Sequence, residues 1–255
     1  MPGEQHFKAI ERTTRTELTP GQFGVVRLDG KAFHTYCRGL AKPFDQQFMD
    51  DMDAVAATLL SEISGVRLAY VQSDEISLIL SDRSPAGDPQ PFVYGGQIQK
   101  LVSIGASIAS THLNVTRLGT STDKVGLFDA RAFSLPTADD VLDYLRWRQR
   151  DAHRNSLSMI AETHFSHRQL AGVSSDGRYT MLMEIGVYPD AGFPLGFRYG
   201  RMVAREEQPG SATFTHRRTK ERITTSFVRQ VPVAHAAPAF GTVDGISQVL
   251  DLLGG

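Results

Sequence analysis

The chain has 255 residues, of which 41% are hydrophobic and 22% are charged, and its 27 basic and 28 acidic residues leave a net charge of −1. This composition is that of a globular protein with a sizeable core, and it excludes a largely disordered, collagen-like or coiled-coil chain. The single cysteine, Cys37, excludes an intramolecular disulfide framework and a cysteine-rich zinc site. There is no apolar run of about 18 residues and no apolar signal-peptide stretch. We therefore expect a cytoplasmic protein with no membrane partner.

Strands and helices are predicted from apolar spacing and from capping and turn residues. In chain order the predicted elements are a polar lead-in with at most a short helix at 1–20, a strand at 23–28, a short helix or loop at 31–45, a helix at 45–64, a hairpin at 66–80, a loop at 83–91, a helix at 92–118, a strand at 128–133, a helix from 137 to about 148, further helix at 151–170 and a strand at 179–188. Beyond about residue 204 the periodicity fades, and we expect a less regular appendage there.

The most informative polar residues follow two predicted strands. Asp29-Gly30 ends the first strand, and Ser73-Asp74-Glu75 forms the tip of the hairpin. If the first strand lies beside the hairpin, Asp29 and Asp74 project from neighbouring strand ends. Two carboxylates and a backbone carbonyl suit Mg²⁺, which prefers oxygen ligands, and a pair of such ions can align the oxygens of a phosphoryl transfer. From the spacing alone, an ordinary turn and a solvated loop remain the alternative.

Five short motifs, in the same order, resemble those of the tRNA-histidine guanylyltransferase family. They are VRLDGKAFH at 26–34, AKPFD at 41–45 with Phe44 where the family usually has Asn, YVQSDEIS at 70–77, FDAR at 128–131 and YLRWRQRD at 144–151. Each motif is weak alone, but five in order are specific, and the resemblance runs from about Gly24 to Arg201.

The resemblance implies an α+β fold: a polymerase- and cyclase-like palm with an antiparallel sheet backed by helices, followed by a helical and irregular C-terminal extension. We expect residues 1–136 to form the palm-like catalytic core and residues 137–255 to complete the same catalytic unit. The implied activity is 3′-to-5′ nucleotide addition to the 5′ end of tRNA, after ATP or GTP activates the 5′-phosphate. The implied partners are tRNA, ATP and GTP, and relatives assemble as homotetramers, as dimers of dimers.

The resemblance also implies site residues. The implied catalytic residues are Asp29, Asp74 and Glu75. The implied ligands of two Mg²⁺ ions are Asp29, the Gly30 carbonyl and Asp74. The implied nucleotide-binding residues are Asp29, Gly30, Lys31, Ala32, Phe33, His34, Lys42, Ser73, Asp74 and Lys100. For Lys42 and Lys100 the alternative is a solvated surface residue, for His34 a structural ring, and for Phe33 a core position. An Arg expected shortly before Lys100 is replaced by Gln97.

The second half is predicted to contact tRNA. The His-Ile-Asn-Asn-Leu-Tyr-Asn stretch of the eukaryotic enzymes is matched here only at His153, Asn155 and Leu157. In this the chain looks more like the bacterial and archaeal guanylyltransferase-like proteins, which favour templated repair of truncated tRNA 5′ ends. We expect tRNA contacts at Arg148, His153 and Asn155. Arginines also cluster at 146–154 and basic residues at 216–222, which suits backbone phosphates; a solvated helix face is the alternative.

Two rival functions remain open. A nucleotidyl cyclase of the palm fold uses the same metal carboxylates, but the Trp147-Arg148-Gln149 and Lys42-Pro43 motifs speak against it. A tRNA-binding relative that has lost catalysis is the second rival; intact Asp29, Asp74 and Glu75 speak against that one.

Overall fold

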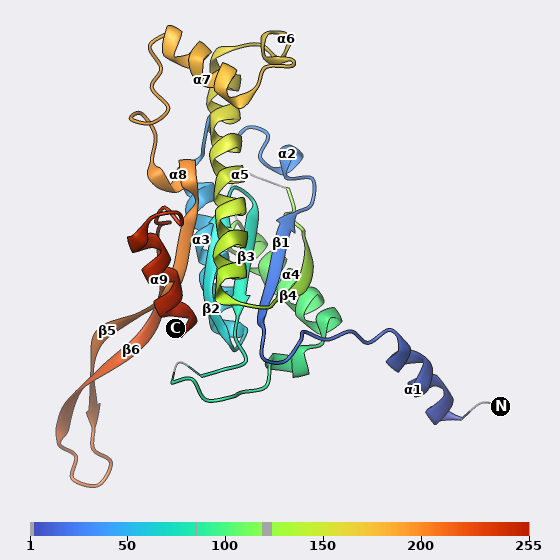
Figure 1. Cartoon of the computed structure of the whole chain (residues 1–255). Coiled ribbons are helices and arrows are strands. Elements are labelled where there is room, and N and C mark those ends of the chain that lie inside the picture. Colours follow the sequence, from blue (N-terminus) through green and yellow to red (C-terminus); the bar gives the residue numbers. More distant parts are fainter. Residues whose placement is uncertain (1–2, 85, 119–123, 255) are drawn as a thin grey trace.

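The computed structural model describes residues 3–84, 86–118 and 124–254, and Figure 1 shows the course of the chain. The strands are β1 (Phe23–Gly30), β2 (Val66–Gln72), β3 (Glu75–Leu80), β4 (Phe128–Leu135), β5 (Arg201–Thr215) and β6 (Arg222–Ala236). The helices are α1 (Glu4–Thr13), α2 (Phe33–Tyr36), α3 (Gln46–Glu62), the 3₁₀ helix η1 (Val93–Gly96), α4 (Ile98–Thr116), α5 (Ala138–His164), α6 (His167–Leu170), α7 (Ser175–Glu184), α8 (Leu195–Tyr199) and α9 (Val243–Leu253).

The strands form one sheet in the order β4-β1-β3-β2-β5-β6, with each neighbouring pair antiparallel. The predicted α+β architecture with an antiparallel sheet is confirmed. Alternate residues of each strand point to opposite faces of the sheet. One face packs on α3 and α4, and the other packs on α5 and α9.

The alternation along β1 decides which residues meet which helices. Val26 and Leu28 belong to the core on the side of α3 and α4, whereas Val25 packs with Tyr144 and Leu145 of α5. Asp29 has the same parity as Val25, so it lies on the α5 side at the end of the strand. The functional end of the sheet is therefore overlaid by the long helix α5.

The predicted helix start at 137 is confirmed: the Thr137 side chain accepts from the Asp140 N–H, and the Asp140 carboxylate accepts from the Thr137 backbone N–H. One continuous helix follows instead of two, because neither Gly nor Pro interrupts residues 138–164. Its far half carries a small separate core with α6 and α7, built around Leu157, Ile160 and Leu182.

Two predictions about the second half are wrong. Residues 179–188 are not a strand, because the Ser174 side chain caps a helix at the Gly177 N–H and α7 then buries Leu182. The residues after 204 are not irregular: β5 pairs with β2, β6 pairs with β5, and α9 covers the sheet. The outer half of this hairpin projects from the body, as Figure 1 shows. Its side chains are exposed on both faces, and it therefore lacks the alternating apolar pattern of a buried strand.

Helix α1 confirms the short N-terminal helix, and none of its residues is buried. Across the described residues, no helix combines the length and the apolar composition that a bilayer crossing requires.

Candidate active site

The pairing of β1 with the β2–β3 hairpin brings the predicted carboxylates together. Asp29 is the register partner of Glu75 across the β1–β3 pair. The Gly30 N–H donates to the Asp74 carbonyl oxygen at 3.2 Å, which joins the end of β1 to the hairpin tip. Ser73 turns the chain there with a φ of +47°, in the left-handed region. Asp29, Asp74 and Glu75 consequently lie at one edge of the sheet.

Gly30 is required by the close packing at this edge. A Cβ atom on Gly30 would collide with the Phe33 ring and lie 2.8 Å from Asp74 Oδ2. Phe33 itself is only 3% exposed and packs with Tyr36 and Phe128 at centroid distances of 4.7 and 5.1 Å. The core interpretation of Phe33 is thus the one that the structure supports, and its ring acts by fixing the turn that follows β1.

The electrostatics of the edge favour a cation. Burial raises the pKa of Asp74, hydrogen bonding to its own backbone lowers it, and the neighbouring Asp29 carboxylate raises it again. Neither carboxylate has a salt-bridge partner among the described residues. Within the same residues, no three His, Cys, Asp or Glu side chains gather as a metal-binding group. Two carboxylates beside the backbone carbonyl of Gly30 are an all-oxygen set, which fits Mg²⁺ that keeps part of its water shell.

Glu75 is held from behind by Arg148. The guanidinium Nε and Nη2 each donate to one Glu75 oxygen at 2.8 Å, and Arg27 Nε lies 3.9 Å from Glu75 Oε2. Both members are buried, with Glu75 8% and Arg148 6% exposed. This two-pronged pair occupies the Glu75 carboxylate and fixes the start of β3.

Arg148, for which a tRNA contact is predicted, is buried in this arrangement, and that contact stays a prediction. Its Nη2 also donates to Asp151 at 2.9 Å, so a buried guanidinium is shared between two carboxylates. Of the other arginines in the 146–154 cluster, Arg146 pairs with Asp143 and Arg154 pairs with Asp151. Arg150 and Arg154 are the exposed members of that cluster.

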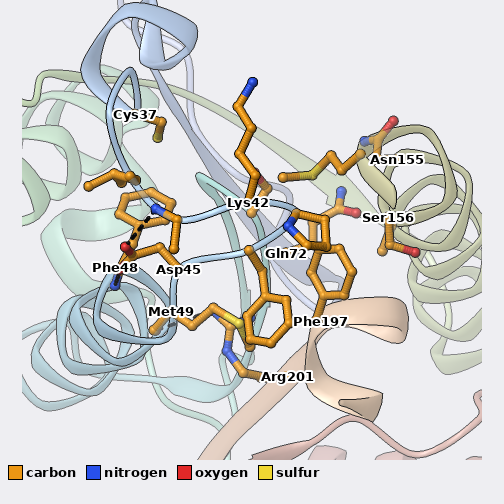
Figure 2. Close-up of a pocket in the computed structure, with 17 residues that line it drawn as sticks. Cys37, Lys42, Asp45, Phe48, Met49, Gln72, Asn155, Ser156, Phe197 and Arg201 are labelled. Atoms are coloured by element: carbon orange, nitrogen blue, oxygen red, sulfur yellow. Dashed lines mark hydrogen bonds between the residues drawn. The ribbon is translucent and has the colours of Figure 1, made fainter. Parts of the chain in front are cut away.

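Two adjoining cavities open beside this edge. The acidic cavity, of about 400 Å³, is lined by Arg27, Asp29, Gln72, Ser73, Asp74, Glu75, Trp147, Arg148, Asp151 and Asn155. The apolar pocket, of about 140 Å³, is drawn in Figure 2 and lies between the 37–49 segment, α5 and α8. In it, the rings of Phe44 and Phe197 lie 4.9 Å apart. Gln72, Ser73 and Asn155 line both cavities, so the two are contiguous.

The remaining predicted nucleotide residues are only partly gathered here. Lys31, Ala32 and His34 are exposed in the segment that follows β1, where the Lys31 N–H donates to the Leu127 carbonyl at 2.7 Å. Lys42 is exposed at the wall of the apolar pocket.

Lys100 is not brought to the site. It lies in the first turn of α4, whose Ile98 N–H donates to the Thr16 carbonyl beside the beginning of β1. Asp29 lies at the other end of that strand, about 20 Å away at 3.3 Å per residue. Within one chain Lys100 is therefore not brought to Asp29, and its contact with a nucleotide stays a prediction.

The tRNA-facing predictions at 153 and 155 differ from each other. The His153 ring stacks on Tyr199 at 4.9 Å and 7°, and burial lowers its pKa. Asn155 is exposed and faces both cavities.

Gln72, Trp147 and Phe197 line these cavities but were not predicted as site residues. Gln72 could have been predicted from the sequence, because it directly precedes Ser73. It also lies two residues after Tyr70 in the same strand, so its side chain is on the same face of the sheet, toward α5. Phe197 could not have been predicted in this way, since it comes from a short helix distant in sequence.

Comparisons with known proteins agree with this geometry. A family profile described as tRNAHis guanylyltransferase matches residues 4–136. A tRNA(His) guanylyltransferase of Schizosaccharomyces pombe is 32% identical over 163 residues, which are 60% of this chain and 57% of that protein, less than two thirds of its length. A bacterial tRNA(His) guanylyltransferase-like protein in complex with GTP superimposes with a TM-score of 0.74, 27% identity and 97% coverage of both chains. Another, in complex with ATP, has a TM-score of 0.73, 34% identity and coverage of 79% of this chain and 86% of that one.

Proposed function

This chain belongs to the tRNAHis guanylyltransferase family, and on that premise we propose that it is a Mg²⁺-dependent nucleotidyltransferase that adds nucleotides in the 3′-to-5′ direction to the 5′ end of tRNA. The observation that carries the proposal is the pair Asp29 and Asp74 at one sheet edge, on a cavity contiguous with an apolar pocket. The 5′-phosphate is first activated by ATP or GTP, and a nucleotide 3′-hydroxyl then displaces the activating group.

The carboxylates of Asp29 and Asp74 and the carbonyl of Gly30 would hold two Mg²⁺ ions. When bound, these ions neutralise phosphate charge and align the attacking and leaving oxygens. Glu75 does not need to ligate them, because Arg148 already engages both of its oxygens. Its role is to fix the tip of the β2–β3 hairpin, so that Asp74 stays beside the end of β1, where Asp29 lies.

The apolar pocket is suited to a nucleobase. Phe44 and Phe197 offer aromatic surface, and Met49 and Met159 line the same pocket. Aromatic and thioether side chains pack favourably on flat π-systems. Lys42 at the wall, together with the 29–34 segment, then faces the triphosphate side of the nucleotide. The bound ATP and GTP of the two bacterial structures support this use of the site.

The 5′ end of the RNA is proposed to approach along the exposed residues of α5, and the turn between β5 and β6 is proposed to contact the RNA backbone. Arg150, Arg154 and Asn155 are exposed on α5, and basic side chains surround the turn at 216–222, where phosphates can be neutralised. We retain residues 1–136 as the catalytic core and residues 137–255 as the part that completes it. Templated repair fits the partial His153-Asn155-Leu157 match better than addition restricted to histidine tRNA.

A homotetramer and a cytoplasmic location also remain proposals. What supports self-association is the projecting hairpin, on one face of which Phe214, Ile223 and Phe227 are 49%, 38% and 42% exposed. Alternation and register place these three side chains on one face, with Phe214 opposite Ile223 and Phe227 four positions farther along β6. Large apolar side chains exposed on one face of a strand pair are suited to contact with another protein surface.

The test is extension of a 5′-truncated tRNA with Mg²⁺ and each nucleotide supplied separately. The proposal predicts a product one or more nucleotides longer at its 5′ end, formed only with a triphosphate for activation. A cyclic nucleotide formed without tRNA extension identifies the cyclase alternative. Binding of tRNA without either product identifies a catalytically inactive relative.

A further inference from the structure

Gln72 has a buried side-chain amide of which only one half is engaged. The residue ends β2 and is 4% exposed. Its Nε2 donates to Glu75 Oε1 at 3.1 Å. Its Oε1 is buried and has no hydrogen-bond partner among the described residues. Buried carbonyl oxygens in native proteins nearly always accept a hydrogen bond, so this one points to a ligand.

The orientation of the amide is dictated by its neighbours. An ionised carboxylate only accepts hydrogen bonds, so the nitrogen and not the oxygen must face Glu75. Arg148 holds the Glu75 carboxylate by both oxygens, which prevents it from turning away. The Gln72 oxygen is therefore presented as a fixed acceptor on the opposite side of the amide.

The place of this acceptor selects the part of the ligand that it meets. Gln72 lines the acidic cavity and also the apolar pocket, where Figure 2 labels it. A nucleotide with its base in the apolar pocket and its triphosphate at Asp29 and Asp74 has its ribose between the two. The ribose hydroxyls are the hydrogen-bond donors of that part of a nucleotide, since an ionised triphosphate has none.

We infer that Gln72 Oε1 accepts a hydrogen bond from the 2′- or 3′-hydroxyl of the bound nucleotide's ribose, so that Gln72 discriminates against the nucleotide that lacks that hydroxyl. The inference rests on the proposed function for the placement of base and triphosphate. It makes Gln72 a specificity-determining residue whose oxygen is positioned by the Glu75–Arg148 pair.

Equilibrium binding of Mg²⁺-ATP, Mg²⁺-2′-deoxyATP and Mg²⁺-3′-deoxyATP tests the inference. Trp147 is the single tryptophan of the chain and lines the acidic cavity, so its fluorescence reports binding without a label. The wild-type protein should bind ATP about 3- to 10-fold more tightly than at least one of the deoxy analogues, the effect of one neutral hydrogen bond. In Gln72→Met that ratio should fall to within about twofold, because the analogue that lacks the donor loses nothing.

Ser156→Ala is the matched control. Ser156 also lines the apolar pocket, but its hydroxyl already donates to the His153 carbonyl at 2.9 Å. Its ratio of ATP to deoxy affinity should equal that of the wild type.

Three results overturn the inference. Equal affinities of the wild-type protein for all three nucleotides overturn it and leave the proposed function intact. This result does not depend on whether the Gln72→Met variant folds. A uniform loss of affinity in Gln72→Met, with the wild-type ratio retained, shows that Gln72 only braces Glu75. Absence of binding of any nucleotide overturns the proposed function together with the inference.

Discussion

Replacing Arg148 with Met removes the guanidinium that holds Glu75 while retaining an unbranched apolar side chain. The change deletes two hydrogen bonds of 2.8 Å to Glu75 and one of 2.9 Å to Asp151. It leaves a carboxylate that is 8% exposed with Arg27 at 3.9 Å as its nearest cation. Breaking a buried ion pair from one side costs about 3–5 kcal/mol. Because Arg27 remains, we expect the lower end, about 3 kcal/mol.

A loss of that size lowers the melting temperature by about 6–12 °C for a chain of this length. Differential scanning calorimetry of Arg148→Met measures this change in melting temperature, with Arg154→Met as the control variant. Arg154 is on the same helix and pairs with Asp151 at 2.6 Å, but its side chain is 59% exposed, so its removal should cost at most about 1 kcal/mol. Filter binding of tRNA to both variants is the second readout. A melting temperature of Arg148→Met near that of the wild type, with weakened tRNA binding, would refute the reasoning and support the prediction that Arg148 contacts RNA.

Gly30→Ala should reduce nucleotide addition at least tenfold, because its Cβ meets the Phe33 ring and lies 2.8 Å from Asp74 Oδ2. The control is Gly105→Ala, in the interior of α4, where the added Cβ lies at least 3.8 Å from the residues around it. This variant should keep activity and gain up to about 1 kcal/mol of stability. In metal-free protein, Asp74→Asn should melt above the wild type at neutral pH. Burial raises the folded-state pKa of Asp74 above its unfolded value, so ionisation costs stability above the folded pKa and nothing below the unfolded one. The melting-temperature difference should therefore shrink as the pH falls through the raised pKa, and a pH-independent difference would contradict this assignment. The double variant Arg217→Ser, Arg218→Ser should make the plot of log association constant for tRNA against log salt concentration less steep, by about 2 in the magnitude of its negative slope. An unchanged slope would show that the RNA does not contact these two arginines.

The parts of the fold that the sequence predicts are those set by local patterns. Asp45 was expected to begin the long helix, and its side chain does accept from the Phe48 N–H at 2.9 Å. The same holds for Thr137 with Asp140, and for the hairpin at 66–80 with its polar tip. In each case the decisive contact joins residues close together in the chain, so the sequence contains both partners of the interaction within one window.

The errors arise where distant packing decides. Residues 179–188 have strand-like composition, but Leu182 packs with residues of α5 and the segment is helical as far as Glu184. The position of Lys100 also depends on distant packing, because the pairing of α4 with the chain near Thr16 places it at the opposite end of β1 from Asp29. The β5–β6 hairpin was not foreseen, because its outer part has no buried face and so no alternation to detect.

The candidate site shows the same division. Asp29, Gly30, Asp74 and Glu75 were predicted together from strand ends, and the β1–β3 register brings them together. The burial of Arg148 was not predictable from its cluster of arginines, because an exposed helix face and a buried ion pair share the same composition. Only the position of α5 over Glu75 distinguishes them.

Mg²⁺-dependent extension of a 5′-truncated tRNA by Asp29→Ala, compared with the wild type, tests the central claim most directly. Asp29 has no ion-pair partner among the described residues, and we propose that it holds metal and not RNA. The account predicts that the variant loses extension at every Mg²⁺ concentration while its affinity for tRNA stays within about threefold of the wild type, less than the effect of 1 kcal/mol. Extension at the wild-type rate would contradict the assignment of Asp29 and Asp74 as the metal-binding pair.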